Sequence, residues 1–294
     1  MAAPLPDAAL IAPGASVPAA AGRAPRRRKY ALDIVIPAVI LVVIFGACFV
    51  WPLVYPVPPP VGGSILSSNL PPFSPGHLLG TDPVGNDILS RILHGGQVSI
   101  EVALGVTLIG LTGAVVGTIA GYIGGLVDAV VMRVIDVLIA FPAIVLALAI
   151  AEGLGPSELH VIWALSIFSV PAFARLARAG TLQLREQTFM LAARLAGTRT
   201  WRMLLRHVWP NVLPQLATFS LLGLGVVVIL EGALDFLGLG IPDPHPSWGN
   251  MIALGQGTLS SQPALVLVPS LFLFVTVVAL NLLGDALRAR WGTQ

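Results

Sequence analysis

Six long apolar stretches constrain the fold of this chain more than any other feature. A helix that crosses the hydrocarbon core of a bilayer needs about 20 mostly apolar residues, because an unpaired backbone polar group there costs several kcal/mol. Of the 294 residues, 56% are hydrophobic and 10% are charged, whereas soluble domains carry about 25% charged residues. The stretches that are long enough cover residues 31–54, 98–121, 129–152, 159–179, 214–236 and 264–284. We therefore expect an all-α membrane protein with six transmembrane helices.

The basic residues predict how these helices are oriented. Of the 16 Lys and Arg residues, five precede the first stretch, seven lie between Arg175 and Arg206, and Arg288 and Arg290 follow the last stretch. If the N-terminus is cytoplasmic, all of these lie in the cytoplasm and only Arg91 falls in an external segment. Because cytoplasmic loops carry an excess of Lys and Arg, we expect an N-in, C-in topology.

The first apolar stretch is interpreted as a retained helix. It is longer than the apolar region of a signal peptide, about 7–15 residues, and no small-residue cleavage site follows it. Ahead of it lies an Ala/Pro-rich segment whose composition favours disorder. After it, Ile88 and Ile92 would form the apolar stripe of a surface helix. The predicted parts are a cytoplasmic disordered basic tail (1–30), the first transmembrane helix (31–54), an extracytoplasmic segment with a surface helix (55–97), a core with five transmembrane helices and a cytoplasmic loop at 186–213 (98–287), and a cytoplasmic tail (288–294).

Two sets of residues inside the spans predict helix contacts. Gly113, Gly117 and Gly121 recur every four residues, a pattern that lets another helix approach closely. Arg133 and Asp136, spaced i, i+3, are expected to form an ion pair on one helix face.

The principal cytoplasmic loop is basic and predicts two short helices. The first covers 187–196 and is closed by Gly197 as its C′ residue. The second is entered through Thr198 or Thr200 as N-cap and is ended by Pro210. At about 100° per residue the second helix has a basic and an apolar face. The basic face holds Arg199, Arg202 and Arg206, and the apolar face holds Trp201, Leu204, Leu205 and Val208.

The residues alone leave two interpretations of this second helix. An interfacial helix would keep its arginines among lipid head groups and its Trp and Leu side chains at the acyl boundary. A docking helix would instead insert its apolar face into a groove on a cytoplasmic partner.

The same loop resembles the EAA loop of ABC importer permeases, in which Glu-Ala-Ala is followed after three residues by Gly and later by Leu-Pro. Ala192 and Ala193 match the alanines, Gly197 the glycine and Pro210 the proline, whereas Leu191 stands where glutamate is usual. The resemblance implies a coupling helix that sits in a cleft of the ATP-binding subunit. The residues that it implies for this contact are Leu191, Ala192, Ala193, Arg194, Gly197, Trp201, Leu204, Leu205 and Val208.

Three further segments are similar to the C-type permeases of dipeptide, oligopeptide and nickel importers. They are HLLGTDPVGNDILSR (77–91), LDFLGLGIPDPHPSWGNMI (234–252) and NLLGDALR (281–288). The resemblance implies a MetI-like ABC importer permease fold in a bacterial plasma membrane, with a peptide as substrate. The partners that it implies are a homologous B-type permease, one or two ATP-binding subunits that hold ATP and Mg²⁺, and an extracytoplasmic substrate-binding protein.

Two carboxylates near the outer end of the fifth span are candidate functional residues. Glu231 and Asp235 are spaced i, i+4, and a charge inside the membrane costs about 2.5–3.5 kcal/mol unless a partner or water compensates it. They would either face a translocation path, where the ammonium group of a peptide could bind, or be protonated or hydrogen-bonded within the bundle.

The loop at 237–262 follows these carboxylates and is rich in Gly and Pro, which restrict it to turns and extended chain. With Pro242, Pro246 and Trp248 it would form a rigid, aromatic-tipped contact for the substrate-binding protein. Alternatively, it is a structural linker that covers the mouth of the bundle.

Several function classes are disfavoured. A Walker A motif cannot occur, because the only lysine, Lys29, is followed by Tyr30. The five histidines are scattered, so no metal site, cofactor or catalytic group is expected, and ATP hydrolysis would occur on partner subunits. A net charge of +2 does not suggest nucleic acid. The alternatives to peptide import are a nickel-chelate or haem-type ABC importer and, less favoured because no inverted repeat is visible, an ion-coupled secondary transporter.

Overall fold

The computed structural model describes residues 27–55 and 57–291, with side chains from Leu32 onward, and all regular elements within these ranges are helical. Predictions for residues 1–26 and 292–294 lie outside the described residues. The α-helices are α1 (Arg27–Phe45), α2 (Trp51–Val54), α3 (Ile88–Ile123), α4 (Gly125–Ile139), α5 (Ala143–Leu154), α6 (Glu158–Arg185), α7 (Thr188–Leu195), α8 (Thr200–Met203), α9 (Trp209–Phe236), α10 (Trp248–Gly255) and α11 (Ala264–Trp291). Residues 27–30 and 288–291, which were predicted to belong to the two tails, are therefore helical.

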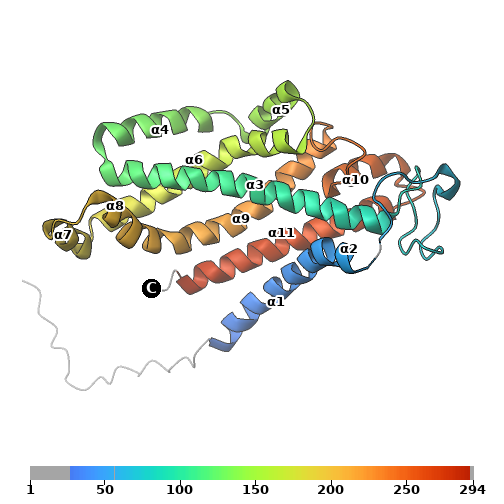
Figure 1. Ribbon diagram of the computed structural model, residues 1–294, viewed down its shortest axis with the longest axis horizontal. Coiled ribbons are helices and arrows are strands. Elements are labelled where there is room, and N and C mark those ends of the chain that lie inside the picture. Colours follow the sequence, from blue (N-terminus) through green and yellow to red (C-terminus); the bar gives the residue numbers. More distant parts are fainter. Residues whose placement is uncertain (1–26, 56, 292–294) are drawn as a thin grey trace, which may run out of the picture.

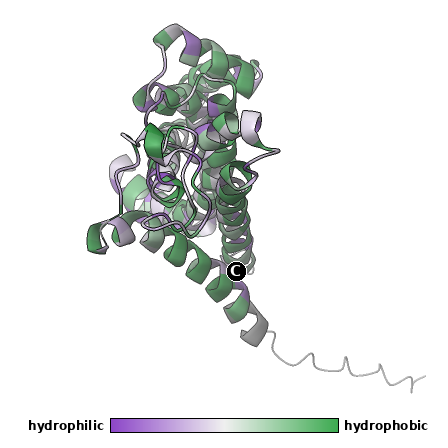
Figure 2. Ribbon diagram, turned by 90° about the vertical axis from the view of Figure 1, so that its right-hand side faces the viewer, coloured by the Kyte–Doolittle hydropathy of each residue, from purple (hydrophilic) through white to green (hydrophobic). Residues whose placement is uncertain are grey.

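Long helices run side by side along the molecule (Figure 1). One end holds α7, α8, the α3–α4 junction and the C-terminal end of α11, and the opposite end holds the 57–87 segment and α10. The arginine-rich α7–α8 end is cytoplasmic by the positive-inside rule, so the arrangement agrees with the N-in, C-in prediction. Hydrophobic residues predominate along the long helices (Figure 2), and many of them are exposed.

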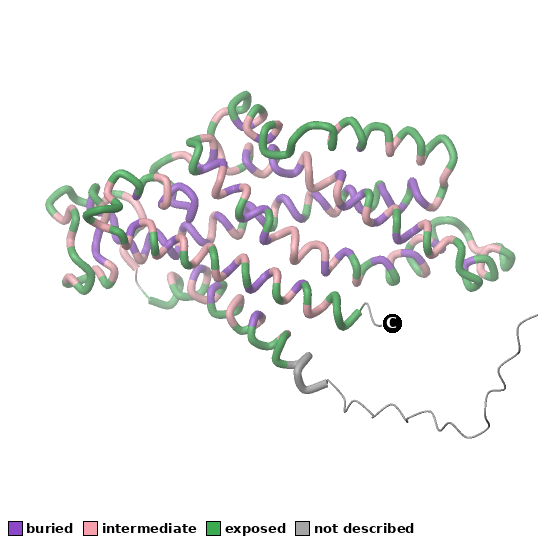
Figure 3. The backbone as a smooth tube through the Cα atoms, turned by 180° about the vertical axis from the view of Figure 1, so that it is seen from behind, coloured by how far each residue is buried: buried purple, intermediate pink, exposed green. Residues whose placement is uncertain are grey.

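Five helices are long and apolar enough to cross a membrane, and α4 with α5 makes a sixth if the bent pair is counted as one span. The continuous helix predicted over 129–152 is wrong, because α4 and α5 are bent by 82° at the break between them. The break contains Phe141 and Pro142. The ring of a proline disfavours the α conformation for the preceding residue, which is why the helix stops there. Much of α4 and α1 is exposed within this single chain (Figure 3).

The first span also adjusts to a proline. α1 passes through a π-helical turn at Gly46–Val50 into α2, which contains Pro52. Because Pro52 has no N–H, it cannot bond to the carbonyl of Cys48, four residues earlier. The Gln97 amide on α3 donates to that carbonyl at 2.6 Å instead. The Gln97 side chain therefore pairs with the Cys48 carbonyl, which would be costly to leave without a hydrogen bond.

The segment at 77–97 differs from the prediction. A separate surface helix is absent from the described 77–97 segment, because α3 begins at Ile88 with Asp87 as its N-cap and continues as the second span. Ile88 and Ile92 do not lie on the membrane surface but are buried, in a cluster with Met251 and Leu265.

The stripe of small residues on α3 faces α6 of the same chain. A Cβ atom added to Gly113 would lie 2.0 Å from the Val170 carbonyl oxygen, and one added to Gly117 would lie 2.0 Å from the Ala174 carbonyl oxygen. The helix backbones are therefore in direct contact, which confirms the close approach predicted from the glycine spacing and identifies the partner helix.

Two ion pairs join α4 to α6. Arg178 holds Asp128 with its Nε and Nη2 at 2.5 and 2.6 Å, and Arg175 Nη2 lies 2.6 Å from Asp136. The predicted pairing of Arg133 with Asp136 is therefore wrong. The carboxylates of α4 pair across to the neighbouring helix because α6 supplies arginines at the same level.

We predict that Gly117→Val destabilises the protein by more than the 1–3 kcal/mol that is typical of overpacking, because the added atoms would meet backbone rather than a movable side chain. The check is the midpoint of thermal aggregation in detergent, followed by size-exclusion chromatography. Gly223→Val is the matched control, since a Cβ there would meet nothing within 4 Å. Equal midpoints for both variants would contradict the proposed contact.

Candidate coupling surface and extracytoplasmic face

The cytoplasmic loop begins with α7, which ends in a Schellman motif. Gly197 has φ +75°, its N–H donates to the Arg194 carbonyl at 2.9 Å, and the Thr198 N–H donates to the Ala193 carbonyl at 3.2 Å. This is the 5→2 and 6→1 bond pair of that motif. The prediction that Gly197 closes the first helix is confirmed, and its positive φ explains why glycine stands there.

The second part of the loop does not end at Pro210 as predicted. α8 continues through a π-helical turn at Leu204–Val208 directly into α9, and the Trp209 N–H donates to the Leu204 carbonyl across that turn. Pro210 then lies in the first turn of α9, where a proline is tolerated. Helix therefore runs without a break from Thr200 to Phe236, 37 residues in all, and the second part of the cytoplasmic loop is continuous with the fifth span.

The predicted apolar face of this helix is divided between inside and outside. Val208 is buried and Leu204 half-buried against the bundle, whereas Trp201 and Leu205 are 53% and 62% exposed. Two methionines that the sequence reasoning missed, Met190 and Met203, are fully buried in the same cluster. These inward side chains fix the loop to the bundle, so only part of the predicted face is free to meet a partner.

On α7, some of the remaining candidate residues are exposed and others pack against the bundle. Leu191 and Ala192 are exposed, Ala193 is half-buried, and the Arg194 guanidinium lies 5.2 Å from the centre of the Tyr122 ring on α3. Leu195, which was not predicted, is 81% exposed. We define the docking patch as four exposed large apolar residues of the loop, each more than half exposed: Leu191, Leu195, Trp201 and Leu205.

At the other end of α9, the two carboxylates are buried within the subunit. Asp235 accepts hydrogen bonds from the Ile241 N–H at 2.5 Å and from the Ser247 hydroxyl, and Ser99 Oγ donates to Glu231 Oε1 at 3.2 Å. Neither side chain lines an open path in this structure, so that expectation is corrected in favour of hydrogen bonding within the bundle. The pair ties α9 to α3 and to the loop before α10.

The loop after α9 is likewise packed inward at its predicted contact residues. Trp248 is fully buried and its indole N–H donates to the Ile92 carbonyl at 3.0 Å. Pro246 is buried and Pro242 is half-buried. The expectation of an exposed aromatic tip is therefore wrong for Trp248, which opens α10 and packs against Phe272. Between the predicted contact residues Pro242 and Pro246, the residues from Asp243 to His245 are exposed.

The 77–91 motif builds the neighbouring external loop. Asp82 accepts from the N–H groups of Val84 and Asn86 at 2.9 and 2.8 Å and from the Asn86 amide at 2.9 Å. Asp87 accepts from the Ser90 N–H at 2.7 Å and lies 2.8 Å from His77 Nδ1. The motif is thus explained by a folded loop that caps α3.

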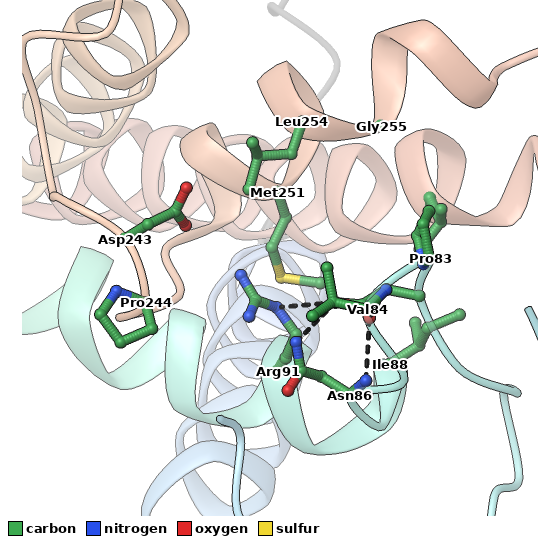
Figure 4. Close-up of a pocket in the computed structure, with 12 residues that line it drawn as sticks. Pro83, Val84, Asn86, Ile88, Arg91, Asp243, Pro244, Met251, Leu254 and Gly255 are labelled. Atoms are coloured by element: carbon green, nitrogen blue, oxygen red, sulfur yellow. Dashed lines mark hydrogen bonds and ion pairs between the residues drawn. The ribbon is translucent and has the colours of Figure 1, made fainter. Parts of the chain in front are cut away.

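This loop and the 243–245 segment enclose an external cavity of about 440 Å³, which is drawn in Figure 4. A second cavity, of about 750 Å³, lies near the cytoplasmic end and is lined by Gln183, Asn211, Gln215, Arg288 and Trp291 among others.

The described chain thus combines membrane-crossing helices with a partly apolar cytoplasmic loop that continues into one of them. The sequence profile of the binding-protein-dependent transport system inner membrane component family matches residues 113–292. The chain belongs to this family, and is a multi-pass protein of a bacterial inner membrane.

Similar curated proteins support this assignment. The glutathione transport system permease protein GsiD of Pectobacterium atrosepticum is 41% identical over 216 residues, covering 73% of this chain and 72% of the relative. GsiD of Escherichia coli O157:H7 is 44% identical over 216 residues, covering 72% and 70%. A solved structure of the inward-facing MetNI methionine ABC transporter aligns with a TM-score of 0.56 at 15% identity, covering 68% of this chain and 95% of that chain. The MetI-like permease fold is therefore confirmed.

We predict that Asp235→Ala loosens the external loop, because the buried Ser247 hydroxyl and Ile241 N–H would lose their acceptor at a cost of about 1–3 kcal/mol. Limited proteolysis at 237–247 should accelerate several-fold relative to the parent protein. The control is Asp243→Ala, which removes an exposed carboxylate from the same loop and should leave the cleavage rate unchanged. Equal protection of both variants would show that Asp235 does not hold the loop.

Proposed function

We propose that this chain is one of two homologous permease subunits that form the translocation pathway of an ATP-driven peptide importer. Family membership and the similarity to GsiD, which is named as a glutathione transport permease, support a peptide-type cargo. The observation that carries the mechanism is the docking patch at the cytoplasmic end of an unbroken helix. Large exposed apolar patches on a protein surface mark interaction sites.

In this proposal ATP and Mg²⁺ bind to one or two cytoplasmic ATP-binding subunits, and this chain contributes no catalytic group or cofactor site. Trp201 and Leu205 enter a groove of the ATP-binding subunit, in the manner of an amphipathic helix docking in an apolar groove. Closure of the ATP-binding subunits displaces α8, and α9 moves with it because the helix is continuous. Val208 and Leu204 of the predicted apolar face pack on the bundle rather than face lipid, which disfavours the interfacial interpretation of the loop.

The other partners are assigned by location. The exposed apolar faces of α1 and α4 face lipid or a homologous B-type permease, as Leu126, Val130, Val134 and Val137 on α4 illustrate. The external end, including the 243–245 segment, receives the substrate-binding protein. A nickel-chelate or haem-type cargo would use the same architecture, and an ion-coupled secondary transporter is the more distant alternative.

The function is tested by reconstituting the chain in proteoliposomes with its neighbouring permease, ATP-binding subunits and binding protein. We expect uptake of glutathione or a dipeptide, and we expect this uptake to require ATP on the side of the membrane where the ATP-binding subunits lie. Uptake that persists without ATP and follows an imposed ion gradient would favour a secondary transporter instead. ATP-dependent uptake of a nickel chelate or haem, but of no peptide, would overturn the peptide assignment.

For the docking patch, we predict that Leu205→Asp lowers ATP-dependent uptake at least 10-fold and reduces co-purification of the ATP-binding subunit. The reason is that a carboxylate would be desolvated in an apolar groove. Leu205 is exposed, so the variant should fold and insert normally. Arg199→Asp is the matched control, because it adds a carboxylate at the N-cap of α8, where aspartate is favoured. Normal coupling by Leu205→Asp would refute the docking assignment.

A further inference from the structure

The external cavity contains a buried arginine with almost no partners. Arg91 is 5% exposed, and a guanidinium has five N–H donors. Among the residues that the structure describes, only the Pro60 carbonyl accepts from it, at 3.4 Å, and Asp82 Oδ2 lies 3.8 Å from its Nε. The separation from Asp82 makes an ion pair but is too long for a hydrogen bond. Most of the guanidinium donors therefore have no acceptor among the described residues and are open to the space of the cavity.

The nearby Asp82 forms an ion pair with Arg91 and so balances part of its charge, but it accepts no hydrogen bond from the guanidinium. Both of its oxygens already accept from the backbone and amide groups of the external loop. The terminal nitrogens of Arg91 point instead into the cavity, toward the side that Asp243 and Pro244 form (Figure 4). An anionic group in the cavity would be able to take these donors in the bidentate way in which guanidinium binds carboxylate.

The rest of the cavity wall restricts what such an anion can be attached to. Its lining is mostly apolar and includes Val84, Ile88, Met251, Leu254 and Leu265. Its volume, about 440 Å³, is within the range of small-molecule sites, which are apolar hollows with a few placed polar groups.

A second charge lies at the opposite side of the cavity. Asp243 is exposed, and its side chain makes no hydrogen bond or ion pair with the residues that the structure describes. A carboxylate there favours a cationic group over a second anion. The wall thus presents a cation inside, an anion at the rim on the side toward which the guanidinium points, and apolar side chains such as Met251 and Leu254 beside them (Figure 4).

We propose that this cavity binds a short peptide in its zwitterionic form, with the C-terminal carboxylate on Arg91, the apolar side chains against Met251 and Leu254, and the ammonium group toward Asp243. The identity of the natural ligand rests on the proposed function, whereas the site itself rests on the cavity. The permease would then hold peptide on its external face, outside the membrane-spanning part of the pathway.

The test is direct binding of L-leucyl-L-leucine to the permease complex in nanodiscs by calorimetry, without ATP or binding protein. We expect that amidation of the peptide C-terminus weakens binding about 10-fold or more, the loss of a charge-assisted hydrogen-bonded pair. N-acetylation should weaken it by a smaller factor, because Asp243 is more exposed than Arg91. Equal affinity for the free and the amidated peptide, or no binding of either, would overturn the proposal.

Variants locate the site. In Arg91→Gln the free and amidated peptides should bind equally weakly, and in Asp243→Asn N-acetylation should no longer matter. Leu254→Trp keeps Arg91 and fills the cavity from a residue that is 56% exposed, so it should fold normally and lose binding. Leu259→Trp, an exposed leucine outside the cavity lining, is the control. Retained binding in Leu254→Trp would overturn the proposal even if Arg91→Gln failed to fold.

The binding measurement and the transport measurement test the two proposals independently. Peptide uptake with no calorimetric binding would leave the importer function standing and remove this site. Peptide binding at Arg91 without ATP-dependent uptake would keep the site and remove the importer function.

Discussion

The need to pair every backbone N–H and C=O group inside a bilayer determines most of this structure, because water cannot satisfy them there. Prolines test that constraint, since each removes a donor. At Pro52 the chain widens into a π turn and Gln97 takes the freed Cys48 carbonyl. Before Pro210 a second π turn lets the cytoplasmic helix continue into α9. At Pro142 the helix bends sharply into α5. Three prolines thus give three local solutions, and two of them preserve a continuous span.

The same constraint explains how the helices pack. Helices in lipid gain little from burying apolar side chains against each other, so close backbone contact and polar bonds decide which pairs form. The glycine face of α3 lies directly on the backbone of α6, and Arg178 of α6 holds Asp128 of α4. α3 and α6 therefore form the centre of the chain, with α4 attached by charge at the cytoplasmic end.

What the sequence predicted well depended on local pattern, and what it missed depended on distant partners. The spans, the glycine stripe and the Gly197 cap each follow from spacing within a few residues. For Glu231 and Trp248 the sequence left an exposed and a buried role open, because their partners, Ser99 and Ile92, are more than 130 residues away along the chain. The apolar face of α8 was read as one surface, since periodicity alone cannot distinguish a side chain that packs on the bundle from one that is free. A continuous helix was predicted across Pro142, where the structure has a break, and a helix end was predicted at Pro210, where the helix continues. The outcome at a proline depends on whether a neighbouring turn can adjust, which the local pattern does not show.

The unbroken helix from Thr200 to Phe236 connects the two ends of the molecule mechanically. At about 1.5 Å per residue its 37 residues span about 55 Å. Its cytoplasmic end carries Trp201 and Leu205 of the docking patch, and its external end carries Glu231 and Asp235, which bond to α3 and to the loop that holds Asp243. If the helix moves as one body, as the proposed mechanism requires, a displacement at the docking patch also displaces the rim of the external cavity. By linkage, a ligand that binds one position of that rim more tightly must favour the corresponding position of the docking patch by the same free energy. In the proposed mechanism the buried carboxylates hold the external loop to the helix that transmits the displacement, a physical role that a place on the translocation path would not give them.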